Sequence, residues 1–455
     1  MNLEGKNVLV VGTGVSGIAA TELLVNKQIN TILFDGNVNL DTEKLYAKSD
    51  ILKQVPLVLG TLTEEQMEEI DVAVLSPGVP TDIPMVCQMR EKGIEIWGEI
   101  ELAYYFSKGR IVAITGTNGK TTTTALTGEI MQSFFEDVRV VGNIGIPYTS
   151  EALTTSEETV IVAEISSFQL ETIHKFQPIV SAILNITPDH LDRHHTMEGY
   201  ICAKADITKN QTKNEICVLN YEDEVLRDFA VTCPANVVFF SSKRKLTDGF
   251  YYNENDKQIY YAQNGTDEVI IHIDELNILG EHNYENVMSA CAMAVGMGVP
   301  MDKIREVLKK FEAVEHRIEY VTEKRGVRFY NDSKGTNPDA AIKAVKAMNR
   351  PTILIGGGYD KQSEYDEWIE SFDGKVKELV LVGQTAEKIK VCAQKHGFMN
   401  TIIFEKFDEA VYYCYEQAKS GDAVLLSPAC ASWGMFKNYE ERGRIFKEIV
   451  KGLKE

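Results

Sequence analysis

The first part of the chain alternates short apolar runs with amphipathic stretches. Apolar runs at residues 7–11, 31–34 and 71–75 predict strands, and residues 17–27 predict a helix between the first two. The third run stops at Ser76-Pro77-Gly78, a sequence that favours a turn. Strands that are joined through helices favour a parallel sheet, so this pattern predicts the β-α-β beginning of an α/β domain.

Two further units continue the alternation. The second has predicted strands at 110–114, 159–163 and 179–184, and helices near 283–297 and 302–312. Its segment 250–273 is rich in Tyr and Ile and is broken at 253–257 and 264–268, which predicts antiparallel hairpins. The third unit has predicted strands at 327–330, 352–355, 378–382 and 423–426, with helices near 338–348, 384–395 and 407–418.

Length agrees with this division. At roughly 150 residues per domain, 455 residues predict three domains. We place them at residues 1–98, 99–313 and 314–455. The fold class is α/β, with Rossmann-like first and third domains. The central domain is of the phosphate-loop ATPase type, with a parallel sheet followed by antiparallel hairpins.

Charge and composition exclude several classes of protein. The formal net charge of −20 disfavours binding to nucleic acid or to anionic membranes. No apolar run approaches the roughly 20 residues of a membrane-spanning helix, and the first apolar strand is too short for a signal peptide. The eight cysteines include no C-x-x-C pair, as expected for reduced thiols. We therefore expect a cytoplasmic protein that binds neither nucleic acid nor membrane.

The first chemical motif is Gly12-Thr13-Gly14-Val15-Ser16-Gly17, which follows a predicted strand and opens a predicted helix. It fits the G-x-G-x-x-G pattern, in which the backbone approaches a pyrophosphate at a helix N-terminus. Asp35 ends the second strand, where a carboxylate can bond a ribose hydroxyl. The alternative is a tight strand-to-helix turn without a ligand. The motif alone does not decide which nucleotide binds.

The second motif is Gly116-Thr117-Asn118-Gly119-Lys120-Thr121, between a strand and the threonine-rich start of a helix. It departs from a strict Walker A sequence, because Ile114 stands at the position of the first glycine. The physics is unchanged: amide N–H groups hold phosphate oxygens, Lys120 reaches the β- and γ-phosphates, and Thr121 can bind Mg²⁺. The motif therefore predicts ATP binding.

Two polar residues follow the next predicted strands. Glu164 comes after the strand at 159–163, and His190 lies in the loop after 179–184. In a parallel sheet both would lie at the carboxyl edge beside the phosphate loop, where they could hold Mg²⁺. Taken alone, Glu164 would more commonly be a solvated or helix-capping acid, and His190 a hydrogen-bonded loop residue.

The order and spacing of several motifs resemble the Mur ligase family over the whole chain. These are the second glycine motif, Ser166-Ser167-Phe168-Gln169-Leu170, Pro188-Asp189-His190-Leu191-Asp192, Gly280-Glu281-His282-Asn283-Tyr284-Glu285-Asn286, His316-Arg317 and Asn331-Asp332-Ser333-Lys334-Gly335-Thr336-Asn337-Pro338. Folylpolyglutamate synthases share some of them. The run Leu426-Ser427-Pro428-Ala429-Cys430-Ala431-Ser432-Trp433 and the nucleotide-type first domain look like the D-glutamate-adding members of the family.

The resemblance implies that the first domain binds the UDP part of a sugar nucleotide. The implied contacts to this substrate, UDP-N-acetylmuramoyl-L-alanine, are Gly14, Val15, Ser16, Asp35, Asn143 and His190. Gly36-Asn37 stand where the family often has Thr-Arg, so a cationic contact to the diphosphate is not matched there. The implied ATP contacts are Gly116, Thr117, Asn118, Gly119, Lys120, Thr121, Thr122, Asn283, Asn286, Arg317 and Asp332.

The resemblance also implies a metal site and an acceptor site. The implied Mg²⁺ ligands, to two ions, are Thr121, Glu164, His190 and Lys204, the lysine having been carbamylated by CO₂. The implied catalytic residues are Lys120, Glu164, His190 and Lys204, and a monomer is expected. The implied D-glutamate contacts are Thr336, Lys361, Ser432, Trp433 and Tyr439. The sequence around Lys361 and at Trp433 departs from the common family pattern.

The implied reaction activates the alanyl carboxylate as an acyl phosphate, which the amine of D-glutamate then attacks. Such an intermediate hydrolyses in water, so we expect closure, with Arg317 and Asp332 completing the ATP site. Plain structural roles compete at single positions: Asn283 and Asn286 could cap a helix, and Arg317 and Lys204 could be surface cations.

Three alternative functions remain. The nearest is a Mur ligase with another acceptor, such as L-alanine. A nicotinamide-dependent dehydrogenase would explain the first glycine motif but would leave the second and the Glu164, His190 and Lys204 set without a role. A phosphate-loop ATPase acting as a binding module would leave the first motif and the C-terminal run without a role.

Overall fold

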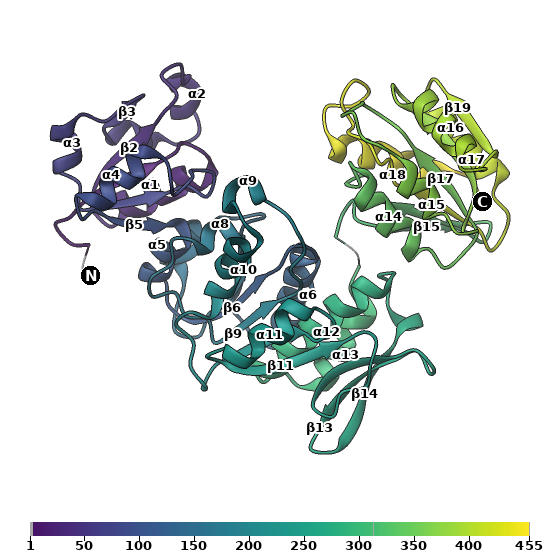
Figure 1. The fold of residues 1–455 in the computed structure, drawn as a ribbon, viewed down its shortest axis with the longest axis horizontal. Coiled ribbons are helices and arrows are strands. Elements are labelled where there is room, and N and C mark those ends of the chain that lie inside the picture. Colours follow the sequence, from purple (N-terminus) through teal and green to yellow (C-terminus); the bar gives the residue numbers. More distant parts are fainter. Residues whose placement is uncertain (1–2, 313, 455) are drawn as a thin grey trace. The chain divides into compact units, whose positions relative to one another are not determined.

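The computed structural model describes residues 3–312 and 314–454, which form three β-sheets flanked by helices (Figure 1). Contacts divide the chain into two compact units. Unit 1 extends to Ile271 and includes residues 285–307, and it contains the first two sheets. Unit 2 consists of His272–Tyr284 and the chain from Leu308 onward, and it contains the third sheet. The domain ranges given above stay a prediction.

The first sheet is a parallel sheet with strand order β3-β2-β1-β4-β5. The order reverses between β1 and β4, and ligands of open α/β sheets bind beyond the strand ends at such a reversal. Its strands are β1 (Asn7–Val11), β2 (Asn30–Asp35), β3 (Leu57–Leu59), β4 (Val72–Leu75) and β5 (Glu95–Gly98). Its helices are α1 (Val15–Asn26), α2 (Thr42–Tyr46), η1 (Asp50–Gln54), α3 (Glu64–Glu68), α4 (Pro84–Glu91) and α5 (Glu99–Phe106).

The second sheet has the order β14-β13-β12-β11-β10-β9-β6-β8-β7. It is parallel from β7 to β12, and β12 pairs antiparallel with β13, which confirms the predicted change to hairpins. Its strands are β6 (Arg110–Thr115), β7 (Val138–Gly142), β8 (Val160–Glu164), β9 (Val180–Ile183), β10 (Ile216–Asn220), β11 (Asn236–Ser241), β12 (Gly249–Asn253), β13 (Gln258–Gln263) and β14 (Thr266–His272).

The helices between and after these strands are mostly short. They are α6 (Lys120–Gln132), α7 (Tyr148–Glu151), η2 (Ala152–Thr154), α8 (Ser167–Leu170), α9 (Leu191–His194), α10 (Met197–Ala205), η3 (Asp206–Thr208), α11 (Glu224–Thr232), η4 (Ile273–Glu275), α12 (Glu281–Gly296) and α13 (Met301–Lys310). Helix α6, which follows the second glycine motif, packs against β7 and β8.

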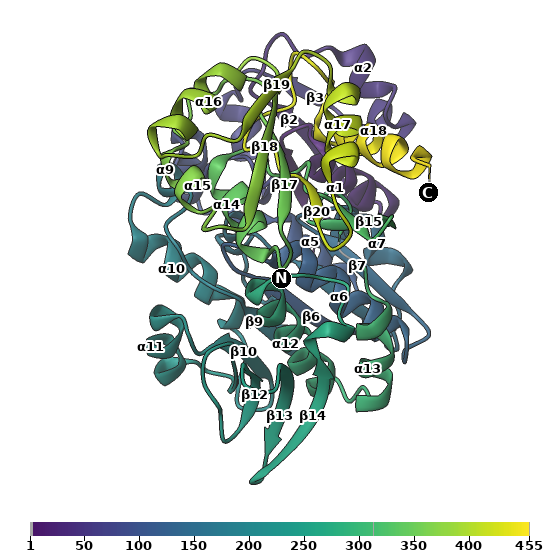
Figure 2. The same ribbon diagram turned by 90° about the vertical axis from the view of Figure 1, so that its right-hand side faces the viewer.

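The third sheet has the order β15-β16-β20-β17-β18-β19, and Figure 2 shows its strands β17 and β18 side by side. Only β15 pairs antiparallel; the other pairs are parallel. Its strands are β15 (Glu319–Lys324), β16 (Val327–Asn331), β17 (Thr352–Gly356), β18 (Val376–Val382), β19 (Thr401–Phe404) and β20 (Ala423–Leu426). Its helices are α14 (Pro338–Ala347), α15 (Asp366–Glu370), α16 (Ala386–Lys395), α17 (Phe407–Gln417) and α18 (Tyr439–Gly452).

The central strands are mostly apolar because both faces of each sheet are covered. In β17, Leu354 faces the core that contains Trp368, whereas its neighbour Ile353 faces the core that contains Phe446. Successive side chains of a strand point to opposite faces, so a strand with two buried faces is apolar at most positions. This explains the continuous apolar runs from which the strands were predicted. No helix among the described residues is both long and apolar enough to cross a membrane.

Candidate functional site

The second glycine motif forms the turn between β6 and α6. Gly116 has φ +148° and Gly119 has φ +86°, a region that disfavours side chains. A Cβ atom on Gly119 would lie 2.4 Å from Oδ1 of Asn286. The turn therefore needs glycine for its backbone conformation and for its close packing. It leaves amide groups at the N-terminus of α6, where phosphate groups bind in such folds.

The loop that follows β9 holds this turn in place. Thr117 N donates to Asn185 O at 2.9 Å, and Asn118 N donates to Asn185 Oδ1 at 2.8 Å. The side-chain amide of Asn185 donates back to Asn118 O at 3.1 Å. The hydroxyl of Thr117 lies 3.1 Å from that of Tyr200. The turn is thus preorganised by partners about 70–80 residues away.

Two lysines converge on one carbonyl oxygen of the turn. Lys120 Nζ donates to Gly116 O at 2.9 Å, and Lys204 Nζ donates to the same oxygen at 2.8 Å. Lys204 is only 2% exposed. Burial and the nearby charge of Lys120 lower the pKa of Lys204 from 10.5 to about 7. An anionic ligand at the turn would offset the charge of Lys120, and the neutral form of Lys204 is favoured beside it.

Thr121 and Thr122 occupy the first turn of α6 after Lys120, and neither is buried. A threonine hydroxyl at this place can serve as an oxygen ligand for Mg²⁺. The sequence predicted the motif from Gly116 to Thr121 between a strand and a helix start, and in the structure it lies between β6 and the first residues of α6.

Glu164 is the last residue of β8, and its carboxylate is buried. Asn143 Nδ2 donates to Glu164 Oε1 at 2.9 Å, and Asn143 N donates to Glu164 O at 2.8 Å. The two residues were predicted for different ligands, a metal and the sugar nucleotide, and the structure pairs them. A buried carboxylate oxygen at the edge of the sheet is a donor of the type that Mg²⁺ prefers.

His190 follows β9 and has φ +51°, an uncommon conformation for a residue with a side chain. Its ring is half exposed, lies 4.9 Å from that of Phe168 and has Nε2 3.5 Å from Asp189 Oδ2. Its imidazole is therefore open to solvent beside Asp189 and Phe168. Because β8 and β9 both flank β6, the loops that carry Glu164 and His190 still follow strands next to the phosphate turn.

The first glycine motif makes an equally tight turn between β1 and α1. A Cβ atom on Gly17 would lie 1.9 Å from Gly12 O, and one on Gly12 would lie 2.7 Å from Ser76 Oγ. Ser76 Oγ is buried and has no hydrogen-bond partner among the described residues. Ser76 belongs to the segment after β4, at the reversal of strand order, and the sequence signalled it only as part of a turn. Gly14 and Val15 are exposed beside it, and Ser16 is partly exposed.

The carboxylate of Asp35 already has hydrogen-bond partners in the loops that follow β1 and β2. It accepts from Thr13 Oγ1 at 2.6 Å, Thr13 N at 3.1 Å and Asn37 N at 2.9 Å. Partial burial acts to raise the pKa of Asp35, but these hydrogen bonds outweigh it and lower the pKa. Asp35 thus remains ionised and fixes the glycine turn to the end of β2.

Asn283 and Asn286 lie on α12 and are buried. Asn286 Oδ1 accepts from Thr123 Oγ1 at 3.1 Å, which connects α12 to α6 behind the phosphate turn. Asn283 Nδ2 donates to Leu279 O at 2.8 Å, four residues earlier. Both side chains therefore have structural hydrogen bonds in addition to the predicted contacts with ATP.

In unit 2, Asp332 lies directly after β16 and is buried. Its carboxylate accepts from Ser427 Oγ at 2.7 Å and from Ile318 N at 3.3 Å. Burial raises the pKa of Asp332 to about 7, although both hydrogen bonds and the charge of Arg317 act against this. Arg317 Nε is buried without a hydrogen-bond partner among the described residues.

The predicted acceptor residues lie in unit 2 around the segment after β20. Ser432 is buried, whereas Trp433 is 53% exposed. Lys361 Nζ lies 5.0 Å from the ring centre of Trp433. Thr336 and Tyr439 are partly exposed, at the starts of α14 and α18. The structure thus brings Lys361 and Trp433 together although 72 residues separate them in the sequence.

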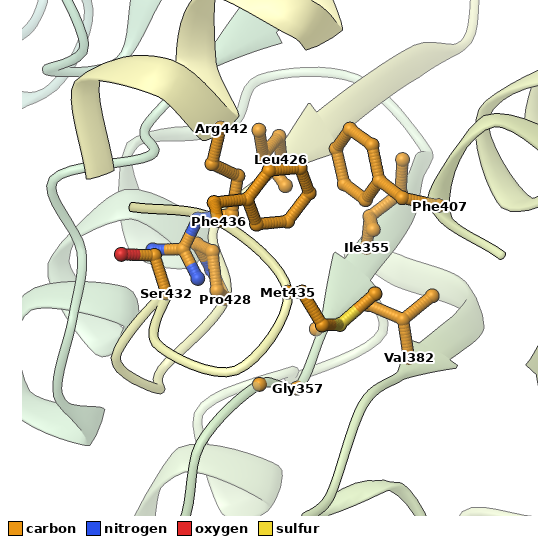
Figure 3. Close-up of a pocket in the computed structure, with 12 residues that line it drawn as sticks. Ile355, Gly357, Val382, Phe407, Leu426, Pro428, Ser432, Met435, Phe436 and Arg442 are labelled. Atoms are coloured by element: carbon orange, nitrogen blue, oxygen red, sulfur yellow. The ribbon is translucent and has the colours of Figure 1, made fainter. Parts of the chain in front are cut away.

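Arg442 of α18 fixes this segment through hydrogen bonds. Its position in the sequence did not indicate this role. Its guanidinium is 2% exposed and donates to Ser333 Oγ at 2.9 Å, Ser333 O at 2.7 Å and Cys430 O at 3.1 Å. Figure 3 shows Arg442 beside Ser432 and Pro428 at a hollow whose other labelled residues are mostly apolar. That hollow has no room for a water molecule, so it belongs to the core and is not a ligand site.

Comparison with family models covers most of the chain. Residues 6–98 match "Mur ligase MurD-like, N-terminal domain", residues 114–294 match "Mur ligase middle domain", and residues 316–430 match "Mur ligase, glutamate ligase domain". The chain belongs to the Mur ligase family. The three Mur ligase models follow one another in the order of the three sheets.

Relatives within the Mur ligase family match over full length. A protein of Lachnoclostridium phytofermentans is 57% identical over 455 residues, and one of Lachnospira eligens is 56% identical over 453 residues, with 100% of both chains covered in each case. One of Clostridioides difficile is 47% identical over 460 residues, again with full coverage. Each of the three carries the name UDP-N-acetylmuramoylalanine--D-glutamate ligase.

Solved structures of Mur ligases share the fold. The UDP-N-acetylmuramate-alanine ligase MurC of Thermotoga maritima has a TM-score of 0.58 at 18% identity and covers 99% of this chain and 100% of its own. MurF of Acinetobacter baumannii has a TM-score of 0.58 at 16% identity, with 90% and 88% covered. At this identity the likeness concerns the fold alone.

Proposed function

We propose that this protein is an ATP-dependent ligase that joins D-glutamate to UDP-N-acetylmuramoyl-L-alanine, in the cytoplasmic synthesis of peptidoglycan precursors. The choice of acceptor rests on the full-length relatives that are 47–57% identical and named as D-glutamate ligases. The single structural observation that carries the ATP part is the convergence of Lys120 and Lys204 on Gly116 O at the N-terminus of α6.

We place the sugar nucleotide in the first domain. The glycine turn at residues 12–17, the exposed Gly14 and Val15 and the unpartnered Ser76 hydroxyl surround the reversal between β1 and β4. The uridine diphosphate would approach the amides at the start of α1, and Asp35 would act mainly by fixing the turn, because its carboxylate is already hydrogen-bonded. The acyl end would extend to Asn143 and His190.

We place ATP on the turn of residues 116–119. The amides at the start of α6 and the ammonium of Lys120 would hold the β- and γ-phosphates, whose negative charge offsets that of Lys120. A dehydrogenase has no use for this second turn. A binding module without a reaction has no use for a buried carboxylate and a buried amine at its edge.

The residues beside the phosphate turn, at the carboxyl edge of the second sheet, are suited to bind magnesium ions. Thr121 offers a hydroxyl and Glu164 a buried carboxylate, and both are oxygen donors of the kind that Mg²⁺ binds. His190, in the loop after β9, would complete the set. Bound magnesium would offset charge on the phosphate oxygens. All other groups that promote the reaction in this proposal are side chains and backbone amides of the protein.

The surroundings of Lys204 favour carbamylation of its amine. Its amine is buried, is directed at the phosphate turn and lies beside a second cation, so that its neutral form, which reacts with CO₂, is favoured there. A carbamate would turn this position from a cation into an oxygen donor. We therefore assign Lys204 as a carbamylated ligand of magnesium in the working enzyme.

We place D-glutamate on unit 2. Lys361 would pair with a carboxylate of D-glutamate, and Thr336, Ser432 and the amides near Trp433 would orient the rest. Arg442 would act as a positioning residue, because it fixes Ser333 and Cys430 on either side of these groups. Every proposed binding group is on one chain, so we propose a monomer.

The proposed reaction has two steps. The alanyl carboxylate attacks the γ-phosphorus of ATP, forming an acyl phosphate and releasing ADP. The amine of D-glutamate attacks the acyl carbon, loses a proton and expels inorganic phosphate, so that an amide bond replaces the acyl–phosphate bond. Lys120 offsets the negative charge of the phosphoryl group during transfer, and positioning of the reactants lowers much of the remaining barrier.

Phosphate release tests the proposal. With ATP, Mg²⁺ and UDP-N-acetylmuramoyl-L-alanine, release should require an amino acid, and D-glutamate should support it far better than L-glutamate or L-alanine. Equal rates with L-alanine would reassign the acceptor. Release without the sugar nucleotide would indicate a plain ATPase.

Chemical rescue tests the carbamate separately. Lys204→Ala should be nearly inactive, and short carboxylic acids that replace the carbamate should restore part of its activity. Lys204→Arg keeps the charge but cannot be carbamylated and should stay inactive. A fully active Lys204→Arg would show that the carbamate is not needed, while leaving the acceptor assignment intact.

A further inference from the structure

Helices α15 and α16 of unit 2 bring together three side chains that can bind a metal. Asp366 is the first residue of α15, Cys392 is on α16 and His396 directly follows it. A carboxylate oxygen, the thiol sulfur and a ring nitrogen of these residues all lie within 4.8 Å of one another. Cys392 and His396 are four residues apart, so they lie on the same side of their helix. None of the three belongs to the proposed active site.

Two carboxylates lie beside the ring of His396. His396 Nε2 lies 2.8 Å from Asp366 Oδ1. The other ring nitrogen, Nδ1, lies 3.4 Å from Glu370 Oε1, one turn further along α15. A histidine that binds a metal through one nitrogen commonly donates its other N–H to a carboxylate. Glu370 thus stands where a supporting residue for a histidine ligand would be.

The chemical types of the three donor atoms indicate which metal would bind. A thiolate and an imidazole are softer than the oxygen donors that Mg²⁺ and Ca²⁺ require, and together with one carboxylate they suit Zn²⁺. We propose that Asp366, Cys392 and His396 form a zinc site in which water takes the fourth coordination position. The bound ion would fasten α15 to α16.

Lys395 competes with the metal for Asp366, and the hydrogen bond between His396 Nε2 and the same carboxylate oxygen would also have to open. Lys395 Nζ donates to Asp366 Oδ1 at 2.7 Å, but its side chain is 70% exposed. It can therefore move into solvent when zinc takes its place, at the cost of one exposed ion pair, which contributes little to stability. Burial and the neighbouring Asp366 raise the pKa of the Cys392 thiol, so zinc would have to displace its proton. Cys392→Ser would preserve an ion-pair network but not a zinc site, so this substitution distinguishes the two interpretations.

Titration with zinc and with Co²⁺ tests the site on the full chain. One equivalent of zinc should bind and raise the midpoint of thermal unfolding. Co²⁺ should show the visible bands of a tetrahedral ion and the near-ultraviolet band of a Co–S bond. Cys392→Ser and His396→Gln should each abolish the high-affinity equivalent and the Co–S band. Cys87→Ser, which removes another partly exposed thiol, should change neither.

Two exposed positions keep the test informative if a ligand variant folds poorly. Glu370→Gln should weaken zinc binding by roughly tenfold, the effect of losing a supporting carboxylate. Lys395→Gln should strengthen binding, because it removes the competing cation. The proposal is overturned if zinc binds equally well to Cys392→Ser, if cobalt shows no Co–S band, or if Lys395→Gln weakens binding.

Discussion

Replacing Lys204 with methionine should make the protein more stable while removing its activity. The ammonium of Lys204 is buried, and Gly116 O, which accepts its hydrogen bond, also accepts one from Lys120. Methionine has a similar length and leaves no unsatisfied carbonyl. The substitution removes one hydrogen bond and the cation–π contact of Lys204 Nζ, which lies 4.7 Å from the ring centre of Tyr200. Each of these interactions contributes about 1 kcal/mol.

The gain in the free energy of unfolding comes from removing a buried charge, which destabilises the folded protein. A pKa lowered from 10.5 to about 7 corresponds to roughly 5 kcal/mol at 1.36 kcal/mol per pKa unit. After subtraction of the lost contacts, we expect the variant to be more stable by about 2–3 kcal/mol near neutral pH, within the range seen when buried charges are replaced by apolar groups.

The sign of the pH dependence is fixed by the direction of the shift. The folded protein holds fewer protons on Lys204 than the unfolded chain between pH about 7 and 10.5. The unfavourable contribution of Lys204 is therefore complete below pH about 7 and vanishes as the pH approaches 10.5. The advantage of the variant should shrink over the same interval.

Urea unfolding in CO₂-free buffer, at about pH 7 and about pH 10, measures this difference. Lys48→Met, which replaces an exposed lysine, should change the free energy of unfolding by less than about 0.5 kcal/mol at either pH. A Lys204→Met protein less stable than the wild type at pH 7, or a difference independent of pH, would refute the reasoning.

Three further substitutions have defined outcomes. Gly119→Ala forces a Cβ atom to within 2.4 Å of Asn286 Oδ1 at φ +86°, so the affinity for ATP, measured by calorimetry, should fall at least about tenfold. Relative to Asp332→Asn, the wild type should lose stability to urea as the pH rises from 3.8 through about 7, because burial raises the pKa of Asp332 in the folded state. Arg442→Met leaves Ser333 O and Cys430 O without their donor and should raise the KM for D-glutamate, measured by steady-state kinetics, more than it lowers kcat.

Many interior strands could be predicted from the sequence, whereas the edge strands β7 and β15 and the interior strands β10 and β11 were not predicted. Strands such as β17 are buried on both faces and give a continuous apolar run. The edge strand β15 reads Glu-Tyr-Val-Thr-Glu-Lys and is nowhere fully buried, and β7, at the edge of the second sheet, carries Arg139. Edge strands carry charged residues, which obscure the apolar pattern.

The glycine turns of the candidate site were predictable because their backbone conformations restrict the residue type locally. The pairing of Asn143 with Glu164, and of Lys204 with Gly116 O, was not. These contacts join residues 21 and 88 positions apart, and they depend on how β7, β8 and α10 pack. The same holds for Arg442, whose burial appears only after α18 is placed on the third sheet.

Oxygen transfer from substrate to phosphate tests the proposed ligation most directly. The alanyl carboxylate of UDP-N-acetylmuramoyl-L-alanine is labelled with oxygen-18 and incubated with the protein, ATP, Mg²⁺ and D-glutamate, and the released phosphate is examined by mass spectrometry. Formation of an acyl phosphate predicts that one labelled oxygen per turnover appears in the phosphate and that the amide product retains the other. Unlabelled phosphate released at the same rate as the product would contradict attack of the carboxylate on ATP.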